Sequence, residues 1–494
     1  MHATTLASEC CDNMFSSCTS LTNAPELPAT TLAPYCYRNM FYNCSSLTKA
    51  PQLPATSLAT ECYSWLFANC TSLVEAPQLP ATVMQPRCYE QMFGNCKSLT
   101  NAPELPAASL AGKCYYGLFS GCTSLTKAPK LPAARMAESS YRLMFYNCTS
   151  LLEAPELPAT TLAESSYHSM FVGCSSLAKA SQLPATSLAP YCYSNMYEGC
   201  TSLVEAPQLP ATRMADNCYA NMFQDCTSLT NAPVLPATTL ATRCYSRMFM
   251  GCTSLSNAPE LPAMTLAQNS YYSMFEGCTS LKEAPQLPAT TLEAYCYSNM
   301  FYNCTSLTKA PVSLPATEMK WYCCQQMYSG CTSLVNAPEL PATTLNAYCY
   351  GNMFCGCKSL TKAPELPATT LATGCYSRMF SGCTSLVNAP ELPAMTLVEN
   401  SYFAMFAGCT SLTSFNFGDQ SVFADSANNL SSMFSNCSKL SYIRCLYDDR
   451  DGAGPRSYTN WTSGVAPQGT FVTNTDKWKR GVNGIPEGWN VVIE

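Results

Sequence analysis

Residues 62–73 read Cys-Tyr-Ser-Trp-Leu-Phe-Ala-Asn-Cys-Thr-Ser-Leu, and residues 76–82 read Ala-Pro-Gln-Leu-Pro-Ala-Thr. Variants of this block return every 26 residues along almost the whole chain of 494 residues. The cysteine that closes the first segment falls at positions 18, 44, 70, 96, 122, 148, 174, 200, 226, 252, 278 and 304 and, after one extra residue near Val312-Ser313, at 331, 357, 383 and 409. Such a period indicates that each unit buries its apolar face against its neighbours. The sequence therefore predicts a solenoid.

Composition excludes several classes of protein. Apolar residues make up 47% of the chain, charged residues only 12%, and the net charge is −6. The 26 Lys and Arg residues are scattered among acids, so we expect no nucleic-acid partner. No apolar run is long enough to span a bilayer, and no signal peptide is visible. Residues 1–7 match the middle of the repeat, so we expect the chain to be incomplete at its N-terminus.

Two apolar stripes predict a helix in each repeat. Cys62, Leu66 and Cys70 lie four residues apart, and so do Tyr63 and Phe67, as on one face of a helix. The residue before the closing cysteine is Gly or Asn, the types that tolerate the left-handed conformation after a helix. We predict a helix of about ten residues per repeat.

A short strand should follow each helix. The segment Leu-x-x-Ala-Pro-x-Leu-Pro contains two prolines, which limits the predicted strand to about three residues. Short strands that alternate with helices predict an α/β solenoid: a curved, right-handed, leucine-rich-repeat-like superhelix with parallel strands on its concave face and helices on its convex face. Residues 1–445 would hold about sixteen repeats, the last one degenerate. Residues 446–494 contain three of the five tryptophans and would cap the C-terminal end.

One column of charges alternates along the repeats. Two residues after the repeat leucine stand Lys127, Glu153, Lys179 and Glu205 in consecutive copies. Stacked strands bring equivalent side chains close together, where opposite charges attract. We interpret this column as a structural charge ladder that fixes the register of the strands.

A second column carries three like charges. Glu339, Glu365 and Glu391 stand one residue past the strand proline in successive repeats. A solvated face is the simple interpretation. Stacking like charges nevertheless costs stability without structural return, so these residues are the best candidate for a partner-binding patch. The partner would be basic or would bring a cation.

The 33 cysteines do not form a pattern for metals or disulfides. Twelve lie eight residues before a closing cysteine, but Ser140, Ser166, Ser270 and Ser401 replace the earlier member while the later one remains. Zinc sites require closer spacing and usually histidine, of which the chain has two. We expect no cofactor, no metal and mostly reduced, buried cysteines. Four cysteines outside the ladder are predicted to be the more reactive ones: Cys11, Cys324, Cys355 and Cys445.

No catalytic constellation is apparent, so we do not expect an enzyme. His168 stands at a variable position and is predicted to lie at the surface. The tyrosine that follows each earlier cysteine, as in Tyr63, could form a stacking platform for a sugar or peptide. Its place inside the apolar stripe favours core packing instead.

Met-Phe-x-x-Cys-x-Ser-Leu-Thr, followed by Leu-Pro-Ala-Thr-x-Leu-Ala, resembles the BspA-like leucine-rich-repeat proteins of bacterial cell surfaces. The resemblance covers residues 3–445. It implies a leucine-rich-repeat solenoid, a cell-surface or extracellular location, and adhesion or host-protein binding. The consensus Leu-x-x-Leu-x-Leu-x-x-Asn is absent, because Ala-Pro-x-Leu-Pro replaces its strand.

Two functions remain open at this point. The first is a non-enzymatic, monomeric module that presents an extended concave surface to a protein or glycan partner and inserts no segment into a membrane. The second is a structural spacer or stalk in which the repeats only set length.

Overall fold

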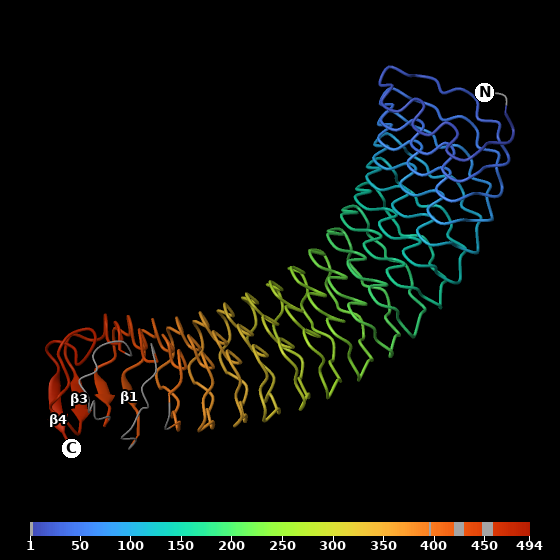
Figure 1. The fold of residues 1–494 in the computed structure, drawn as a ribbon. Helices are drawn as coiled ribbons and strands as arrows, with labels where there is room; N and C mark the ends of the chain where they lie inside the picture. The colour runs from blue at the N-terminus through green and yellow to red at the C-terminus, as the bar shows by residue number, and fades with distance from the viewer. Residues whose placement is uncertain (1–2, 395–396, 419–428, 447–457) are drawn as a thin grey trace. The chain divides into compact units, whose positions relative to one another are not determined.

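The computed structural model describes residues 3–394, 397–418, 429–446 and 458–494. The chain forms two compact units. One comprises the described residues up to Ala237 together with Cys244–Leu255, and the other comprises Thr238–Arg243 and the described residues from Ser256 to Glu494. Within each unit every repeat makes one coil of backbone, and successive coils lie side by side (Figure 1).

The predicted helices are absent from the described residues. Residues 59–70 form a chain of tight turns, which we call the turn ribbon in every repeat. The N–H groups of alternate residues from Cys62 to Cys70 donate to the carbonyl three residues earlier, at N···O distances of 3.0–3.3 Å. Those of the residues between them, Glu61 to Asn69, donate to carbonyls of the next repeat at 2.7–3.1 Å. An α-helix would bond each N–H four residues back, so the prediction of helices was wrong.

The apolar stripes are reproduced by a different geometry. Glu61, Trp65 and Asn69 have φ angles of 53°, 59° and 62°, in the left-handed region. One left-handed residue in every four reverses the chain regularly, so residues four apart share a face just as they do in a helix. The left-handed residues point outward, and Leu66 and Phe67 between them are completely buried.

The predicted three-residue strands are also replaced within the repeats, by single-residue bridges. Parallel bridges join Lys49 to Glu75 and Glu75 to Asn101, and a second row joins Ser57 to Val83. Proline cannot donate to a ladder, which explains why pairing stops after one residue.

Longer strands appear only where the prolines are gone. β1 (Ser414–Asn416), β2 (Tyr442–Arg444), β3 (Thr470–Thr473) and β4 (Asn490–Ile493) form one parallel sheet in sequence order. In the register of this sheet, Phe415 pairs with Ile443, Ile443 with Phe471, and Phe471 with Val491. The C-terminal segment therefore continues the bridged column of the repeats as a sheet. A domain boundary at residue 445 remains a prediction.

The core consists of columns of equivalent side chains. In the first unit, neighbouring rings of the tyrosine column from Tyr37 to Tyr219 stack at centroid distances of 5.6–6.0 Å. A second column begins with Phe15 and Phe41 at 5.6 Å. The Tyr37 and Tyr63 side chains are fully buried, which confirms that this column packs in the core.

Candidate binding surfaces

The acidic row comprises Glu339, Glu365 and Glu391, and all three side chains are exposed. Glu339 is fixed by its backbone. Its N–H donates to the Val312 carbonyl at 2.9 Å, and its carbonyl accepts from Leu314 at 3.0 Å. The extra residue in the preceding repeat thus makes an additional bridge, between Ser313 and Glu339. The backbone is held while the carboxylate points to solvent.

Two shallow hollows run along the acidic row. The first, of about 470 Å³, is lined by both Glu339 and Glu365, with Lys362 and several prolines. The second, of about 350 Å³, is lined by Glu391 and β1. In the described part of the chain none of the three carboxylates forms an ion pair. The row therefore offers unpaired acceptors beside open space, with one lysine among them.

The four residues of the predicted charge ladder lie on adjacent coils. Parallel bridges join Glu153 to Lys179 and Lys179 to Glu205. Lys127 is bridged to Asn101, and the residues just before Lys127 and Glu153 are joined by a backbone hydrogen bond of 3.3 Å. All four side chains are exposed.

No ion pair forms among these four residues as the structure describes them. In the same column of the second unit, Lys309 does pair with Glu283, at 2.5 Å. Exposed pairs of this kind contribute about 0–1 kcal/mol. The role of the ladder in setting register stays a prediction.

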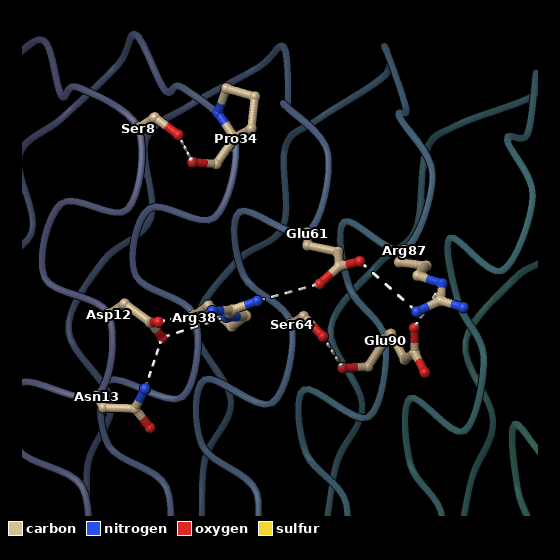
Figure 2. A network of polar contacts seen from close by, with 9 residues as sticks. All are labelled: Ser8, Asp12, Asn13, Pro34, Arg38, Glu61, Ser64, Arg87 and Glu90. Atoms are coloured by element: carbon tan, nitrogen blue, oxygen red, sulfur yellow. Dashed lines mark hydrogen bonds and ion pairs between the residues drawn. The ribbon is translucent and has the colours of Figure 1, made fainter.

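Sequence reasoning missed a charge network on the turn ribbons of the first unit. Figure 2 shows Arg38 between Asp12, at 2.7 Å, and Glu61, at 3.6 Å. Arg87 then joins Glu61 and Glu90, each at 3.6 Å (Figure 2). Burial raises the pKa of Glu90, and the Arg87 guanidinium acts in the opposite direction. Asp12 and Arg38 are 26 residues apart, one repeat, and this spacing could have indicated the contact. It does so only once the turn ribbon is known to place these two positions side by side.

The closing cysteines are hydrogen-bond donors as well as apolar fillers. The Cys70 thiol donates to the Phe41 carbonyl, with S···O at 3.1 Å, and Cys122 donates to Phe93 at the same distance. Equivalent bonds recur along the chain at 3.0–3.2 Å. Burial raises the pKa of the Cys122 thiol to about 12, which keeps it protonated and able to donate.

The prediction that the cysteines are mostly buried is confirmed, since 29 of the 33 are buried, whereas their reduced state stays a prediction. The prediction of four reactive thiols was wrong for Cys324 and Cys445, which are fully buried. Cys324 occupies the position of the core tyrosine in its repeat, between Tyr297 and Tyr350, and a hydrogen bond with the Cys323 thiol, together with burial, raises its pKa. Cys11 and Cys355 are half-buried.

His168 is not a surface residue as predicted. It is half-buried beside the Tyr191 ring, at a centroid distance of 6.3 Å, and its Nδ1 is buried without a partner. Burial, with a smaller effect of Arg142, lowers its pKa from the ordinary 6.5 to about 4. The side chain is therefore neutral at physiological pH.

The described residues contain no group of three or more His, Cys, Asp or Glu placed to hold a metal ion. Nor do they contain a helix able to cross a membrane.

Comparisons with known proteins identify the family to which the repeats belong. The family model described as "BspA type Leucine rich repeat region (6 copies)" matches residues 5–126, 87–230, 216–352 and 325–447. No curated protein matches the chain. The crystal structure of a leucine-rich repeat protein from Bacteroides ovatus ATCC 8483 is 18% identical and covers 90% of this chain and 91% of that one, with a TM-score of 0.44. Because the family model spans most of the sequence, the chain belongs to the family of BspA type leucine-rich repeat proteins.

Proposed function

We propose that this chain is a non-enzymatic binding module of a cell surface, which uses the acidic row to hold a basic protein partner. The observation that carries the proposal is the set of three unpaired, exposed carboxylates at equivalent positions of consecutive repeats, beside two hollows. Membership of the repeat family supports a binding role, because repeat proteins present extended surfaces to their partners.

Charge makes the row suited to a cationic partner. Opposite charges accelerate encounter and select against acidic competitors, and both effects weaken as salt screens them. Lys362 lines the first hollow, so the three carboxylates of the row and this lysine together carry a net charge of −2. A partner with spaced lysine or arginine side chains could contact the carboxylates and avoid Lys362.

The chain supplies a matched control for the test. Glu26, Glu104 and Glu156 stand at the same position of the repeat, are also exposed, and are not on consecutive repeats. The test variant reverses the acidic row (E339K, E365K, E391K), and the control variant reverses the other three (E26K, E104K, E156K). Both change the net charge equally.

The measurement is binding to arrays of extracellular proteins and glycans at low and physiological salt. We expect the wild type and the control to retain the same basic proteins, and the test variant to lose them. Equal binding by all three chains would remove the acidic row from the mechanism. The absence of binding by any chain would favour the alternative, a structural spacer whose repeats set length only.

A further inference from the structure

A strip of tyrosines lies on the outer side of the turn ribbon in the second unit. Tyr295, Tyr322 and Tyr348 occupy the first left-handed position of three consecutive ribbons, with φ angles of 59°, 54° and 54°. Their rings stack at 5.0 and 5.2 Å, nearly parallel, and each is half-buried. This column differs from the core tyrosines, which are fully buried. Because each ring covers the face of the next, the strip presents ring edges and hydroxyl groups to solvent.

Trp321 adds a free aromatic surface beside this strip. Its side chain is 60% exposed. The equivalent residues of the two adjacent ribbons are Ala294 and Ala347, as the bonds from Tyr295 N–H to the Trp321 carbonyl and from Tyr322 N–H to the Ala347 carbonyl show, each at 3.1 Å. Alanine is too small to cover an indole. The indole is therefore exposed to solvent between two alanines. Packing within the protein does not explain a tryptophan at this position.

A row of amides runs parallel to the tyrosines. The second left-handed position of the same three ribbons holds Asn299, Gln326 and Asn352. Their backbone N–H groups are used within the ladder, at 2.8–2.9 Å. Across the described residues, the side-chain amides of Gln326 and Asn352 make no hydrogen bond to the protein. They are half-buried and free to bind a ligand.

These three ribbons are uncharged at both positions, whereas several other ribbons carry a charge at one of them. In the first unit the tyrosine position carries Glu61, Arg87 and Lys113. In the amide column the next residue is Arg378, whose guanidinium lies over the Phe403 ring at 5.2 Å. An open indole, a line of phenol hydroxyls and unpaired amides form a surface with one apolar part and many neutral donors and acceptors.

We propose that this surface, formed by Trp321, the three tyrosines and the amides of Gln326 and Asn352, binds a neutral oligosaccharide. A sugar ring has an apolar C–H face that packs on an aromatic ring, and a rim of hydroxyl groups. Amides both donate and accept hydrogen bonds, which matches hydroxyl groups that do the same. The absence of charge at these positions disfavours acidic glycans and charged peptides. The site lies on the turn ribbon and is independent of the acidic row.

The chain itself suggests variants that preserve the fold. W321A introduces the residue already present at 294 and 347, and the triple variant Y295N, Y322N, Y348N introduces the residue present at 269 in the same column. Asparagine tolerates the left-handed conformation, so the backbone is not strained. Y191N is the control, because Tyr191 stands at the same position in the first unit and the adjacent ribbons carry Ser165 and Asn217 there, so no tyrosine strip forms.

The probes are neutral hexasaccharides of β-1,4-glucose, β-1,4-xylose, α-1,4-glucose and mannose, with a hyaluronan oligosaccharide and a proline-rich peptide for comparison. Binding is measured by calorimetry and by tryptophan fluorescence, in which W321A removes the reporting indole. We expect at least one neutral hexasaccharide to bind, with roughly tenfold weaker binding in W321A and in the triple variant and none of this loss in Y191N.

The variant with the reversed acidic row should bind the sugar as the wild type does, so failure of one proposal is distinguishable from failure of the other. The inference is overturned if no neutral hexasaccharide binds, or if sugar binding is unchanged in both test variants. Binding of the proline-rich peptide alone, lost in the triple variant, would also overturn it and assign the surface to extended peptides.

Discussion

His168 allows a quantitative test of the turn ribbon, because its burial arises from that geometry. On an exposed helix position the side chain would keep its ordinary pKa, whereas in the ribbon burial lowers the pKa from 6.5 to about 4. Arg142 and Tyr191 are the neighbouring charged and aromatic groups. The folded state therefore resists protonation of this residue between these two pH values.

The sign and size of the effect follow from linkage. Above pH 6.5 the residue is neutral in both states and contributes no pH dependence. As pH falls toward 4 the unfolded chain takes up a proton that the folded chain does not, so stability is lost. A shift from 6.5 to 4 corresponds to about 3 kcal/mol in full, and to about 2 kcal/mol after discounting for partial exposure to solvent.

The perturbation is H168Q, which removes the titrating group. The Leu143 N–H donates to the His168 carbonyl at 3.0 Å, so its hydrogen exchange reports local opening at this ribbon. Wild type and H168Q are compared at the same pH, which cancels the intrinsic pH dependence of exchange. We expect the protection of wild type relative to H168Q to fall by up to about thirtyfold between pH 7.5 and pH 4.5.

A direct titration serves as the control. The chain has only two histidines, so NMR of labelled imidazole resolves His168 from His2. In R142M the pKa of His168 should rise and still remain below its ordinary value, because burial is the larger cause. A wild-type pKa near 6.5, or a constant ratio of protection across the pH range, would refute the burial of this side chain and with it the ribbon geometry.

Two further predictions concern the core and the ribbon backbone. Native thiol labelling followed by mass analysis should modify Cys10, Cys11, Cys18 and Cys355 and reach the other 29 only after denaturation; labelling of many buried thiols in the native state would contradict the packing. Gly199 has a φ of 70°, and an added Cβ would meet no atom nearer than 3.6 Å. G199A should therefore lower the stability by about 1–2 kcal/mol through backbone strain alone, and G199N by clearly less. Hydrogen exchange of the same ribbon measures both effects. Equal stability of the two variants would argue against a left-handed residue there.

The sequence alone predicts the period, the parallel stacking of repeats and the identity of the buried columns. These follow from spacing, because equivalent residues must meet when identical units stack. The sequence does not predict the turn ribbon, because apolar residues four apart fit a helix and a chain of left-handed turns equally well. A signal was present: Asn217, Asn221 and Asp225 stand four apart in one repeat, and all three have positive φ. Residues of this kind at regular intervals within a segment weaken a helix assignment.

Of the two candidate surfaces, the sequence predicts the acidic row but not the tyrosine strip. Glu339, Glu365 and Glu391 could be found by comparing equivalent positions, which needs only the period. The tyrosine strip could not be distinguished from the core column by type, because Tyr322 and the core tyrosines are both aromatic residues in an apolar-looking segment. Only the ribbon geometry, which leaves Tyr322 half-buried at a left-handed position and buries the core tyrosines completely, separates the two columns.

The ribbon geometry also restricts where any specificity of this protein can reside. Inward positions are fixed by contact with identical neighbours, as the stacking of Tyr37 on Tyr63 at 6.0 Å illustrates, so a change in one coil disturbs two others. The left-handed positions that lie at the surface are less constrained, and there the chain varies from Glu61 and Arg87 to Tyr322 and Gly374. At Gly374 the variation is itself structural, because an added Cβ would lie 2.2 Å from the Tyr348 ring. Glycine there leaves room for the last ring of the tyrosine strip, so consecutive outward positions depend on one another. A ligand surface in this fold must therefore be built from neighbouring coils together.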